Sequence, residues 1–245
     1  MIQDPHAQGT DGWRLARLGR ITASDFERLI TPTGKVARGT TVNRLCAEKV
    51  AEWILGHELD SKETEAMAWG KTYEQRAVES YQIETGLDAV PVGLCLLDDG
   101  SVGASPDRLV GSDGLLEVKC PFSHAVHAGY LLDPSLLETA YRPQVQGQLW
   151  VTGRKWCDLY AWHEIMPTVR VRVVADPEWE ASLSDACADA TARIEAAKKS
   201  LLARGVVSHL EVARRNAKEP TKFATTPDEF DAVFEAAGLP PKERK

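Results

Sequence analysis

The stretch SPDRLVGSDGLLEVKCPF, residues 105–122, decides the expected fold because it places charged residues inside an apolar run. Leu116 and Val118 alternate with Glu117 and Lys119, and side chains that alternate in this way point to opposite faces of a β-strand. One face of the predicted strand is therefore apolar, and the other face carries an acid and an amine.

A tight turn precedes this strand. Asp113 and Gly114 form a dipeptide that is typical of hairpins, so the strand should fold back beside the segment that begins at Asp107. The hairpin then brings Asp107 next to Glu117 and Lys119. Burying isolated charges costs far more than folding can supply, so such groups must be paired or must bind a cation.

A third acid comes from a predicted helix. Residues 63–85 indicate a helix that ends at Gly86, a common C-terminal signal. One stripe of this helix, at spacings of three and four, is mostly apolar; it contains Gly70, Tyr73, Glu74, Ala77 and Tyr81. Glu74 violates the pattern of its stripe, and such violations are expected at functional sites.

Three carboxylates in one place suggest a metal site. Hard oxygen ligands suit Mg2+ or Mn2+, and a bound metal positions water, promotes its deprotonation and stabilises charge on a phosphodiester. Lys119 would orient the water or neutralise the developing oxyanion. Asp107, Glu117 and Lys119 thus predict metal-dependent phosphodiester hydrolysis. The alternative is that Lys119 forms only a salt bridge with one of the acids.

The rest of the chain predicts both helices and strands. Near the N-terminus we expect a short helix, an extended link at residues 21–22 and a second helix capped by Ser24. Later helices are expected over residues 40–55 and after Asp133 and Asp176, with Pro143 kinking or restarting the second of these three. Residues 88–120 predict a meander of strands, and residues 155–165 and 168–175 predict two more. The fold class is α/β, with a central mixed sheet flanked by helices.

Composition limits the remaining possibilities. The 245 residues suit one domain with an appendage, predicted here as residues 1–205 and a C-terminal extension, 206–245, of unknown role. Five scattered cysteines without a C-x-x-C pair indicate neither a disulfide framework nor a zinc site. No run approaches the ~18 apolar residues that a membrane span needs, and no secretory signal is visible. The expected location is the cytoplasm.

The charge distribution leaves DNA binding open. The net charge of −7 is unusual for a protein that handles nucleic acid, but a local basic surface can bind phosphate on an acidic molecule. Basic residues crowd the first 44 positions: Arg14, Arg17, Arg20, Arg28, Lys35, Arg38 and Arg44.

Four blocks of the sequence, taken together, resemble a known family. They are GWRLARLGRITAS (12–24), AMAWGKTYE (66–74), SPDRLVGSDGLLEVKCPF (105–122) and YRPQVQGQLWVTGRKW (141–156). The third block matches the PD-(D/E)xK nuclease signature. The order and spacing of all four, over about residues 11–205, resemble the YqaJ-type viral recombinases, the family of the lambda phage exonuclease. The resemblance implies a restriction-endonuclease-like core.

The resemblance also implies roles for individual residues. Asp107, Glu117 and the Val118 carbonyl would bind Mg2+, for which Mn2+ would substitute, and Lys119 would act on the nucleophilic water. Glu74 would assist a second metal site, and Gln144 would open a Gln-rich helix motif beside the active site, with Gln148 one turn away.

Two further sites follow from the same resemblance. Arg17, Ser24 and Ser105 match positions that bind a terminal 5′-phosphate, and Met67 matches an apolar wedge that helps to part the strands. From the residues alone, Ser24 also fits a helix N-cap, and Met67 also fits a core side chain. Pro143, directly before Gln144, departs from the family's helix.

The implied activity is a Mg2+-dependent exonuclease that degrades one strand of linear double-stranded DNA from its 5′ end. It would release 5′-mononucleotides and leave a 3′ overhang for annealing. The family implies a homotrimeric ring around DNA and a single-strand DNA annealing protein as partner, in phage or prophage recombination inside a bacterial host. The alternatives are a restriction-type or repair endonuclease on the same core, or a non-catalytic DNA-end-binding protein.

Overall fold

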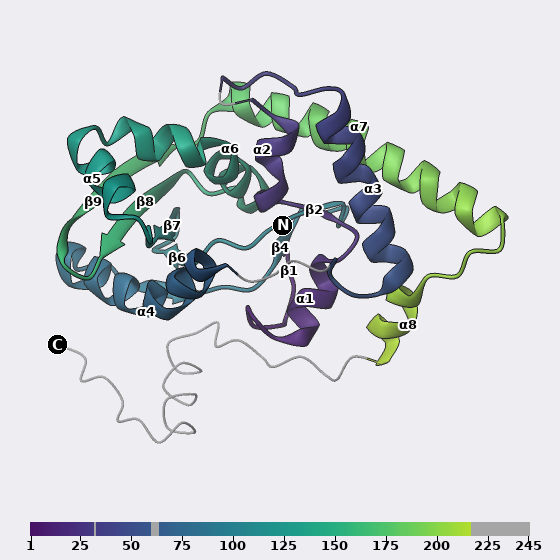
Figure 1. Ribbon diagram of the computed structural model, residues 1–245, viewed down its shortest axis with the longest axis horizontal. Coiled ribbons are helices and arrows are strands. Elements are labelled where there is room, and N and C mark those ends of the chain that lie inside the picture. The colour runs from purple at the N-terminus through teal and green to yellow at the C-terminus, as the bar shows by residue number, and fades with distance from the viewer. Residues whose placement is uncertain (32, 60–63, 217–245) are drawn as a thin grey trace.

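The computed structural model describes residues 1–31, 33–59 and 64–216, and within them the chain forms two β-sheets covered by helices (Figure 1). The larger sheet has the strand order β3-β6-β7-β8-β9 and the smaller one β1-β4-β5-β2. Each sheet contains both parallel and antiparallel pairs. The α/β class is therefore confirmed, although the sequence predicted one central sheet and not two.

The predicted hairpin is present at the centre of the larger sheet. Strands β6 (Arg108–Val110) and β7 (Gly114–Lys119) pair antiparallel, with Arg108 opposite Leu116 and Val110 opposite Gly114. The turn between them is also held from outside, because the Arg154 guanidinium donates to the carbonyl oxygens of Gly111 and Gly114 at 2.9 and 2.7 Å. This register places Asp107, just before β6, beside the end of β7.

Two helices connect β7 to its parallel neighbour β8 (Trp156–His163), which then pairs with β9 (Met166–Val174). They are α5 (His124–Leu132) and α6 (Ser135–Thr152). Helix α5 was not predicted. Helix α6 runs as one helix through Pro143, so the expected restart at that residue is wrong. Leu137, Val145 and Leu149 of α6 are buried against one face of the larger sheet.

Helix α4 (Glu65–Thr85) covers the opposite face of the larger sheet. It begins after Thr64, whose hydroxyl accepts from the Met67 N–H, and it ends at Gly86, whose φ of 68° is the left-handed conformation that glycine tolerates best. The predicted start at residue 63 lies outside the described residues. Ala77 and Tyr81 of α4 are buried against Leu116 and Val118 of β7. The predicted apolar face of that strand is therefore confirmed.

A second core forms between the smaller sheet and three helices. The sheet strands are β1 (Ile2–Gln3), β2 (Ile21–Thr22), β4 (Cys95–Leu96) and β5 (Val102–Ala104), while β3 (Ala89–Pro91) belongs to the larger sheet. The helices are α2 (Phe26–Leu29), α3 (Thr40–Leu55) and α7 (Pro177–Ala203). Phe26, Leu45 and Leu183 are fully buried among them.

The last helix of the described chain, α8 (His209–Asn216), packs against both α3 and helix α1 (Asp11–Arg17). Leu18, Trp53 and Leu210 form a small buried cluster there. Residues up to 216 of the predicted extension are thus packed onto the protein, and residues 217–245 lie outside the described part. The division at residue 205 stays a prediction. No helix among the described residues is long and apolar enough to span a membrane.

Candidate active site

A cavity of about 450 Å³ opens beside the C-terminal end of β7 and the first turns of α4. Six of the predicted site residues line it. They come from three segments of the chain and are Met67, Glu74, Asp107, Glu117, Val118 and Lys119. The side chains that the sequence predicted to converge are therefore brought together around one space.

Glu117 is the most enclosed acid of this cavity. Its Oε1 accepts from the Lys119 ammonium at 2.7 Å and from the Gln144 amide at 2.6 Å. Its Oε2 accepts from the Gln148 amide at 2.7 Å. Gln144 and Gln148 lie one turn apart on α6, so a single helix face holds both oxygens of the carboxylate. Pro143 does not move Gln144 away from the site.

Asp107 is anchored by the backbone of the neighbouring strand. Its Oδ2 accepts from the Val118 N–H at 2.7 Å. Burial raises the pKa of Asp107 well above its usual range, and the charges of Glu117 and Glu74 raise it further, against the opposing effects of Lys119 and of the Val118 N–H. The acids therefore repel one another, and a cation between them would relieve this repulsion.

Lys119 is a permanent cation in this setting. Burial lowers the pKa of its amine, but Glu117 and Asp107 outweigh that effect, so its pKa is raised above the usual value. The ammonium also donates to Gln144 Oε1 at 3.2 Å and lies 4.4 Å from the centre of the Tyr141 ring. A charged amine held in this way can neutralise an oxyanion but has no free lone pair with which to act as a base.

Glu74 lies at the edge of the cavity, where the stripe of its helix leaves the core. Its carboxylate is 3.3 Å from the Arg108 guanidinium, and its side chain is 39% exposed, whereas Ala77 and Tyr81 on the same stripe are buried. The expected violation of the pattern is real, but its direct partner is an arginine that the sequence analysis did not identify.

The donor set fits a hard divalent cation, although no complete cage is formed. In the part of the chain that the structure describes, no group of three or more His, Cys, Asp and Glu side chains is already placed to hold an ion. Arg108 forms an ion pair with Glu74, and Lys119 forms one with Glu117. A cation at Asp107 would compete with these two side chains for Glu74 and Glu117. Carboxylate oxygens that repel one another are suitable ligands for Mg2+ or Mn2+.

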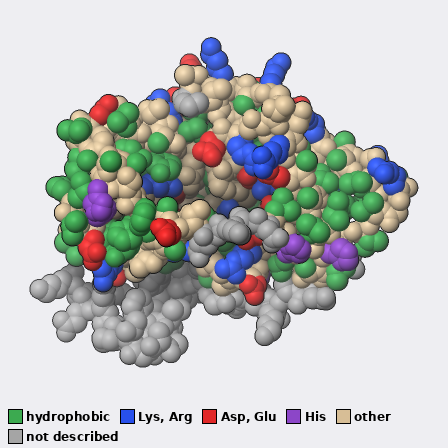
Figure 2. All heavy atoms as spheres, viewed as in Figure 1, with side chains coloured by type: hydrophobic (Ala, Val, Ile, Leu, Met, Phe, Trp, Pro, Cys, Tyr) green, Lys and Arg blue, Asp and Glu red, His purple; other side chains and the backbone are tan. Residues whose placement is uncertain are grey.

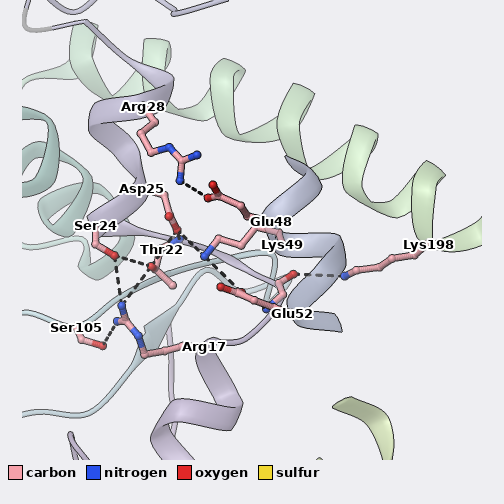
Figure 3. Close-up of polar contacts among 11 residues, drawn as sticks. Arg17, Thr22, Ser24, Asp25, Arg28, Glu48, Lys49, Glu52, Ser105 and Lys198 are labelled. Atoms are coloured by element: carbon pink, nitrogen blue, oxygen red, sulfur yellow. Dashed lines mark hydrogen bonds and ion pairs between the residues drawn. The ribbon is translucent and has the colours of Figure 1, made fainter. Parts of the chain in front are cut away.

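A second polar site surrounds Arg17 (Figure 3), and its residue Ser105 is two positions before Asp107 of the cavity. The guanidinium of Arg17 donates to the hydroxyls of Ser105 and Ser24, both at 3.3 Å, and to that of Thr22 at 3.4 Å. The indole of Trp13 donates to Ser105 at 3.1 Å, and its ring lies 4.5 Å from Arg17 Cζ. Arg17, Ser24 and Ser105, predicted as one pocket from distant parts of the sequence, do lie together.

Helix α3 contacts this polar site through Asp25. The Asp25 carboxylate accepts from the Thr22 N–H at 2.9 Å and lies 3.2 Å from the buried Lys49 ammonium, which is 3.5 Å from Glu52 (Figure 3). Burial lowers the pKa of Arg17, but Asp25 and Glu52 oppose that effect. Ser24 is not the N-cap of the second helix, because Thr22 precedes the 3₁₀ turn Ala23–Asp25 and α2 follows Asp25.

Three residues of these sites were not predicted from the sequence. Thr22 was expected only as part of an extended link, and no role was expected for Tyr141 or Phe122. Tyr141 contacts Lys119, and Phe122 lines the cavity beside Met67. Phe122 is three residues after Lys119 and Tyr141 is three residues before Gln144, and this proximity in sequence could have indicated a place near the site. The Thr22–Arg17 contact depends on the route of the chain between two helices, which periodicity does not specify.

Comparisons with known proteins identify the family and the fold. A family model of the YqaJ-like viral recombinase domain matches residues 12–155. The structure is similar to LHK-Exo in complex with dAMP, at 30% identity and a TM-score of 0.71, covering 80% of this chain and 98% of that one. It is also similar to the alkaline exonuclease LHK-Exo from Laribacter hongkongensis, at 30% identity and a TM-score of 0.64, covering 79% and 98%.

A more distant structure shows the same fold alone. It is a phage related exonuclease from Haemophilus somnus 129PT, at 13% identity and a TM-score of 0.63, covering 74% of this chain and 96% of that one. No curated protein matches the sequence. The family match spans more than half of the chain, and the similarity to LHK-Exo extends over nearly all of that protein. The chain therefore belongs to the YqaJ-like viral recombinase domain family, and it is a nuclease.

Proposed function

We propose that this nuclease is a Mg2+-dependent exonuclease that degrades linear double-stranded DNA from its 5′ ends. It would release 5′-mononucleotides and leave 3′ single-stranded overhangs for strand annealing. One observation carries the proposal: Ser105 of the Arg17 pocket and Asp107 of the acidic cavity are two residues apart on one segment. A terminal phosphate on Arg17 would place a neighbouring phosphodiester at the acids.

The pocket has the chemistry of a phosphate site. A guanidinium offers paired N–H donors to phosphate oxygens, and hydroxyls complete the shell. The Arg17 guanidinium donates to the hydroxyls of Ser24, Ser105 and Thr22, and the residue is half-buried. Because a 5′-phosphorylated end presents a terminal phosphate that internal phosphodiesters lack, recognition there would account for both the requirement for an end and the direction of digestion. LHK-Exo, which is named an alkaline exonuclease and was also solved with dAMP, supports the requirement for an end.

The acidic cavity would perform the hydrolysis. Asp107, Glu117 and the Val118 carbonyl would hold Mg2+, or Mn2+ in its place, with Glu74 assisting a second ion. The metal would polarise the scissile phosphate and make its bound water more acidic. Lys119, fixed by Glu117 and Gln144, would face the negative charge that develops on the phosphoryl oxygens. Gln144 and Gln148 would keep the Glu117 carboxylate in one orientation.

The wider context of the proposal comes from the family. It includes a homotrimeric ring around DNA, an annealing protein as functional partner, a wedge role for Met67, and action in the cytoplasm of a bacterial host on behalf of a phage or prophage. On the face in Figure 2, the Lys and Arg side chains of the described residues lie in small groups among acidic ones. Basic residues such as Arg17 would therefore contact DNA locally, while the net charge stays at −7.

Linear duplexes with and without 5′-phosphates, and a closed circular plasmid, test the proposal in Mg2+ and in chelator. We expect digestion of linear DNA only with metal, faster digestion from phosphorylated ends, and an intact circle. Asp107→Ala and Glu117→Ala should remove activity while folding and DNA-end binding persist. Glu79→Gln, an exposed carboxylate on the outer face of α4, is the control and should retain activity.

The alternatives give different results in the same assay. Cutting of the circular plasmid would indicate an endonuclease of restriction or repair type. Full activity of both alanine variants would remove the catalytic assignment, and DNA-end binding without any hydrolysis in Mg2+ or Mn2+ would leave a non-catalytic end-binding protein. Equal rates on phosphorylated and unphosphorylated ends would remove the Arg17 pocket as a phosphate site but keep the nuclease.

A further inference from the structure

The catalytic cavity has two unlike walls. One carries the carboxylates and Lys119, and the other is formed by apolar side chains that include Met67, Pro121 and Phe122. Hydrolysis of a phosphodiester uses only the polar wall, because the reacting atoms are charged oxygens and phosphorus. The apolar wall needs a different explanation. The volume of about 450 Å³ is within the ordinary range for pockets that enclose a small organic ligand.

Phe122 is the aromatic side chain of this wall. It follows Lys119 by three positions and is 47% exposed, which is unusual for a phenylalanine beside a functional cavity. Its ring packs against the Trp69 indole in a T-shaped arrangement, at 5.7 Å between centroids and 75° between planes. Trp69 is fixed in turn by Tyr73, at 4.3 Å, and by His163, at 5.9 Å. The Phe122 ring is therefore packed nearly perpendicular to an indole that is itself held by two other rings, while about half of the residue remains open.

We propose that Phe122 is a stacking platform for a nucleobase that flanks the scissile phosphodiester. This inference rests on the proposed function of the same cavity and adds the part of the nucleotide that the acids do not hold. An exposed aromatic ring next to bound phosphate is the arrangement with which proteins bind single-stranded nucleic acid, since every base has a π-face. Met67, 49% exposed on the same wall, would contact the sugar or base edge.

The ligand of this subsite is a purine or pyrimidine base without preference for sequence. The polar groups of the cavity are held by one another, as in the contacts of Glu117 with Lys119 and Gln144, so we expect the base to be bound by stacking rather than by hydrogen bonds that read its edge. An enzyme that removes nucleotides one after another requires this tolerance. Stacking would also hold the base after it leaves its partner strand, which would favour separation of the terminal pair.

The test combines changes in the protein with changes in the substrate. Release of the first nucleotide is measured in a single turnover on 5′-phosphorylated duplexes with an abasic site at the first, second or third nucleotide. The proteins are the unsubstituted chain, Phe122→Ala, Phe122→Tyr and the control Val126→Ala. Val126 is exposed to the same extent as Phe122, at 46%, but does not line the cavity.

For the unsubstituted protein, loss of the base at the first or second nucleotide should slow release about tenfold, within the range of one aromatic stacking contact. Phe122→Ala should be slower by a similar factor on the normal duplex and should show little further loss on that abasic duplex. Phe122→Tyr should restore both the rate and the sensitivity, and Val126→Ala should behave as the unsubstituted protein. An abasic site at the third nucleotide should change the rate of release by the same factor in all four proteins.

Equal sensitivity of Phe122→Ala and the unsubstituted protein at both flanking positions would overturn the platform. That result would leave the proposed nuclease function intact, since the unsubstituted protein would still hydrolyse DNA. If Phe122→Ala lowers the thermal midpoint but keeps the full abasic penalty, its role is structural only and the proposal is wrong. An unsubstituted protein that hydrolyses no duplex would instead contradict the proposed function itself.

Discussion

The side-chain amide of Gln148 donates to Oε2 of Glu117 across 2.7 Å, and both residues are buried. Gln148→Ala would leave this carboxylate oxygen without its partner, so we expect Glu117 to lose its fixed orientation. The rate constant for the chemical step should fall at least tenfold, while the affinity for DNA ends stays unchanged. The free energy of unfolding should fall by about 1 to 3 kcal/mol, the usual cost of an unsatisfied buried polar group. Single-turnover kinetics and thermal unfolding measure the two effects.

Gln146 supplies a matched control on the same helix. It is equally buried, but its amide group contacts the Val174 carbonyl and the Asp176 N–H at 2.9 and 3.0 Å, away from the cavity. Gln146→Ala should cost similar stability and, well below its unfolding midpoint, should keep the full chemical rate. A normal rate in Gln148→Ala under the same conditions would show that Glu117 does not need this contact.

Removing the charge of Asp107 should stabilise the protein but abolish its activity. The Asp107 carboxylate is half-buried, and the charges of Glu117 and Glu74 act on it, whereas an asparagine would keep an oxygen for the Val118 N–H without the charge. In chelator, Asp107→Asn should therefore be more stable than the unsubstituted protein by roughly 1 kcal/mol, or about 2 to 4 °C in midpoint for a chain of this size. It should be inactive.

Added Mg2+ should reverse that order. A cation that binds only the folded protein raises its stability by mass action, so Mg2+ should raise the midpoint of the unsubstituted protein and leave that of Asp107→Asn almost unchanged. Calorimetric scans with a series of Mg2+ concentrations check this. Equal shifts in the two proteins would mean that the ion does not bind at Asp107.

Thr22 should contribute to the recognition of a 5′-phosphate. Its hydroxyl accepts from Arg17 at 3.4 Å and donates to Asp25 at 3.2 Å. Thr22→Val keeps the shape and removes both contacts, so Arg17 becomes less well positioned. The ratio of rates on phosphorylated and unphosphorylated ends should fall severalfold. Thr85→Val, which removes a hydroxyl bonded to the Tyr81 carbonyl at the far end of α4, should leave that ratio unchanged.

The hairpin and its acids could be predicted because their signals are local. Alternation in β7 and a two-residue turn specify both the face of each side chain and the register, so Asp107, Glu117 and Lys119 could be placed together. The Gly86 helix end is equally local. The pairing of Glu74 with Arg108 was not predicted, because alternation shows which face Arg108 occupies but not which helix covers that face.

The parts that failed depend on contacts between distant segments. The smaller sheet joins β2 to β5 across about eighty residues of chain, and its strands are only two or three residues long, too short to show a period. Pro143 was expected to kink or restart the helix, yet Pro143 itself, Val145 and Leu149 are buried, and this packing holds the helix through the proline. The Arg17 pocket was found only through the family resemblance, since its residues come from separate segments.

Alkaline pH should destabilise the protein through buried tyrosines. Burial raises the pKa of Tyr160 to about 12, from an ordinary value of 10.0, and its hydroxyl donates to Glu84 at 2.8 Å. The raised value means that its contribution to stability is complete below pH 10 and is lost as the pH rises through about 12. Buried thiols such as that of Cys95, whose pKa is raised to about 11, add to the loss at alkaline pH.

Tyr160→Phe isolates the tyrosine from these thiols. The difference in free energy of unfolding between the two proteins should be constant up to pH 10. It should then change by at most about 1.4 kcal/mol per pH unit, in favour of the variant, as the unsubstituted protein loses its contribution. Urea titrations at a series of pH values provide the measurement. A difference that stays constant up to pH 12 would show that Tyr160 titrates normally.

Gly147 lies between Gln144 and Gln148 on α6. Replacing it with alanine should destabilise the protein, although alanine is the better helix former. Alanine normally stabilises a helix by about 1 kcal/mol relative to glycine. At Gly147, however, a Cβ would lie 1.9 Å from Cδ2 of the Phe26 ring, which is fully buried and has no room to move. We therefore expect Gly147→Ala to lower the free energy of unfolding by about 1 to 3 kcal/mol through overpacking.

Gly70 of α4 is the control for this substitution, because a Cβ there meets nothing within 4 Å. Gly70→Ala should raise stability by up to about 1 kcal/mol. Adding Phe26→Leu to Gly147→Ala should restore part of the loss, although Phe26→Leu alone is destabilising, because the smaller side chain makes room for the new methyl group. Strictly additive effects of these two substitutions would mean that the cost arises elsewhere than at the contact between α6 and α2.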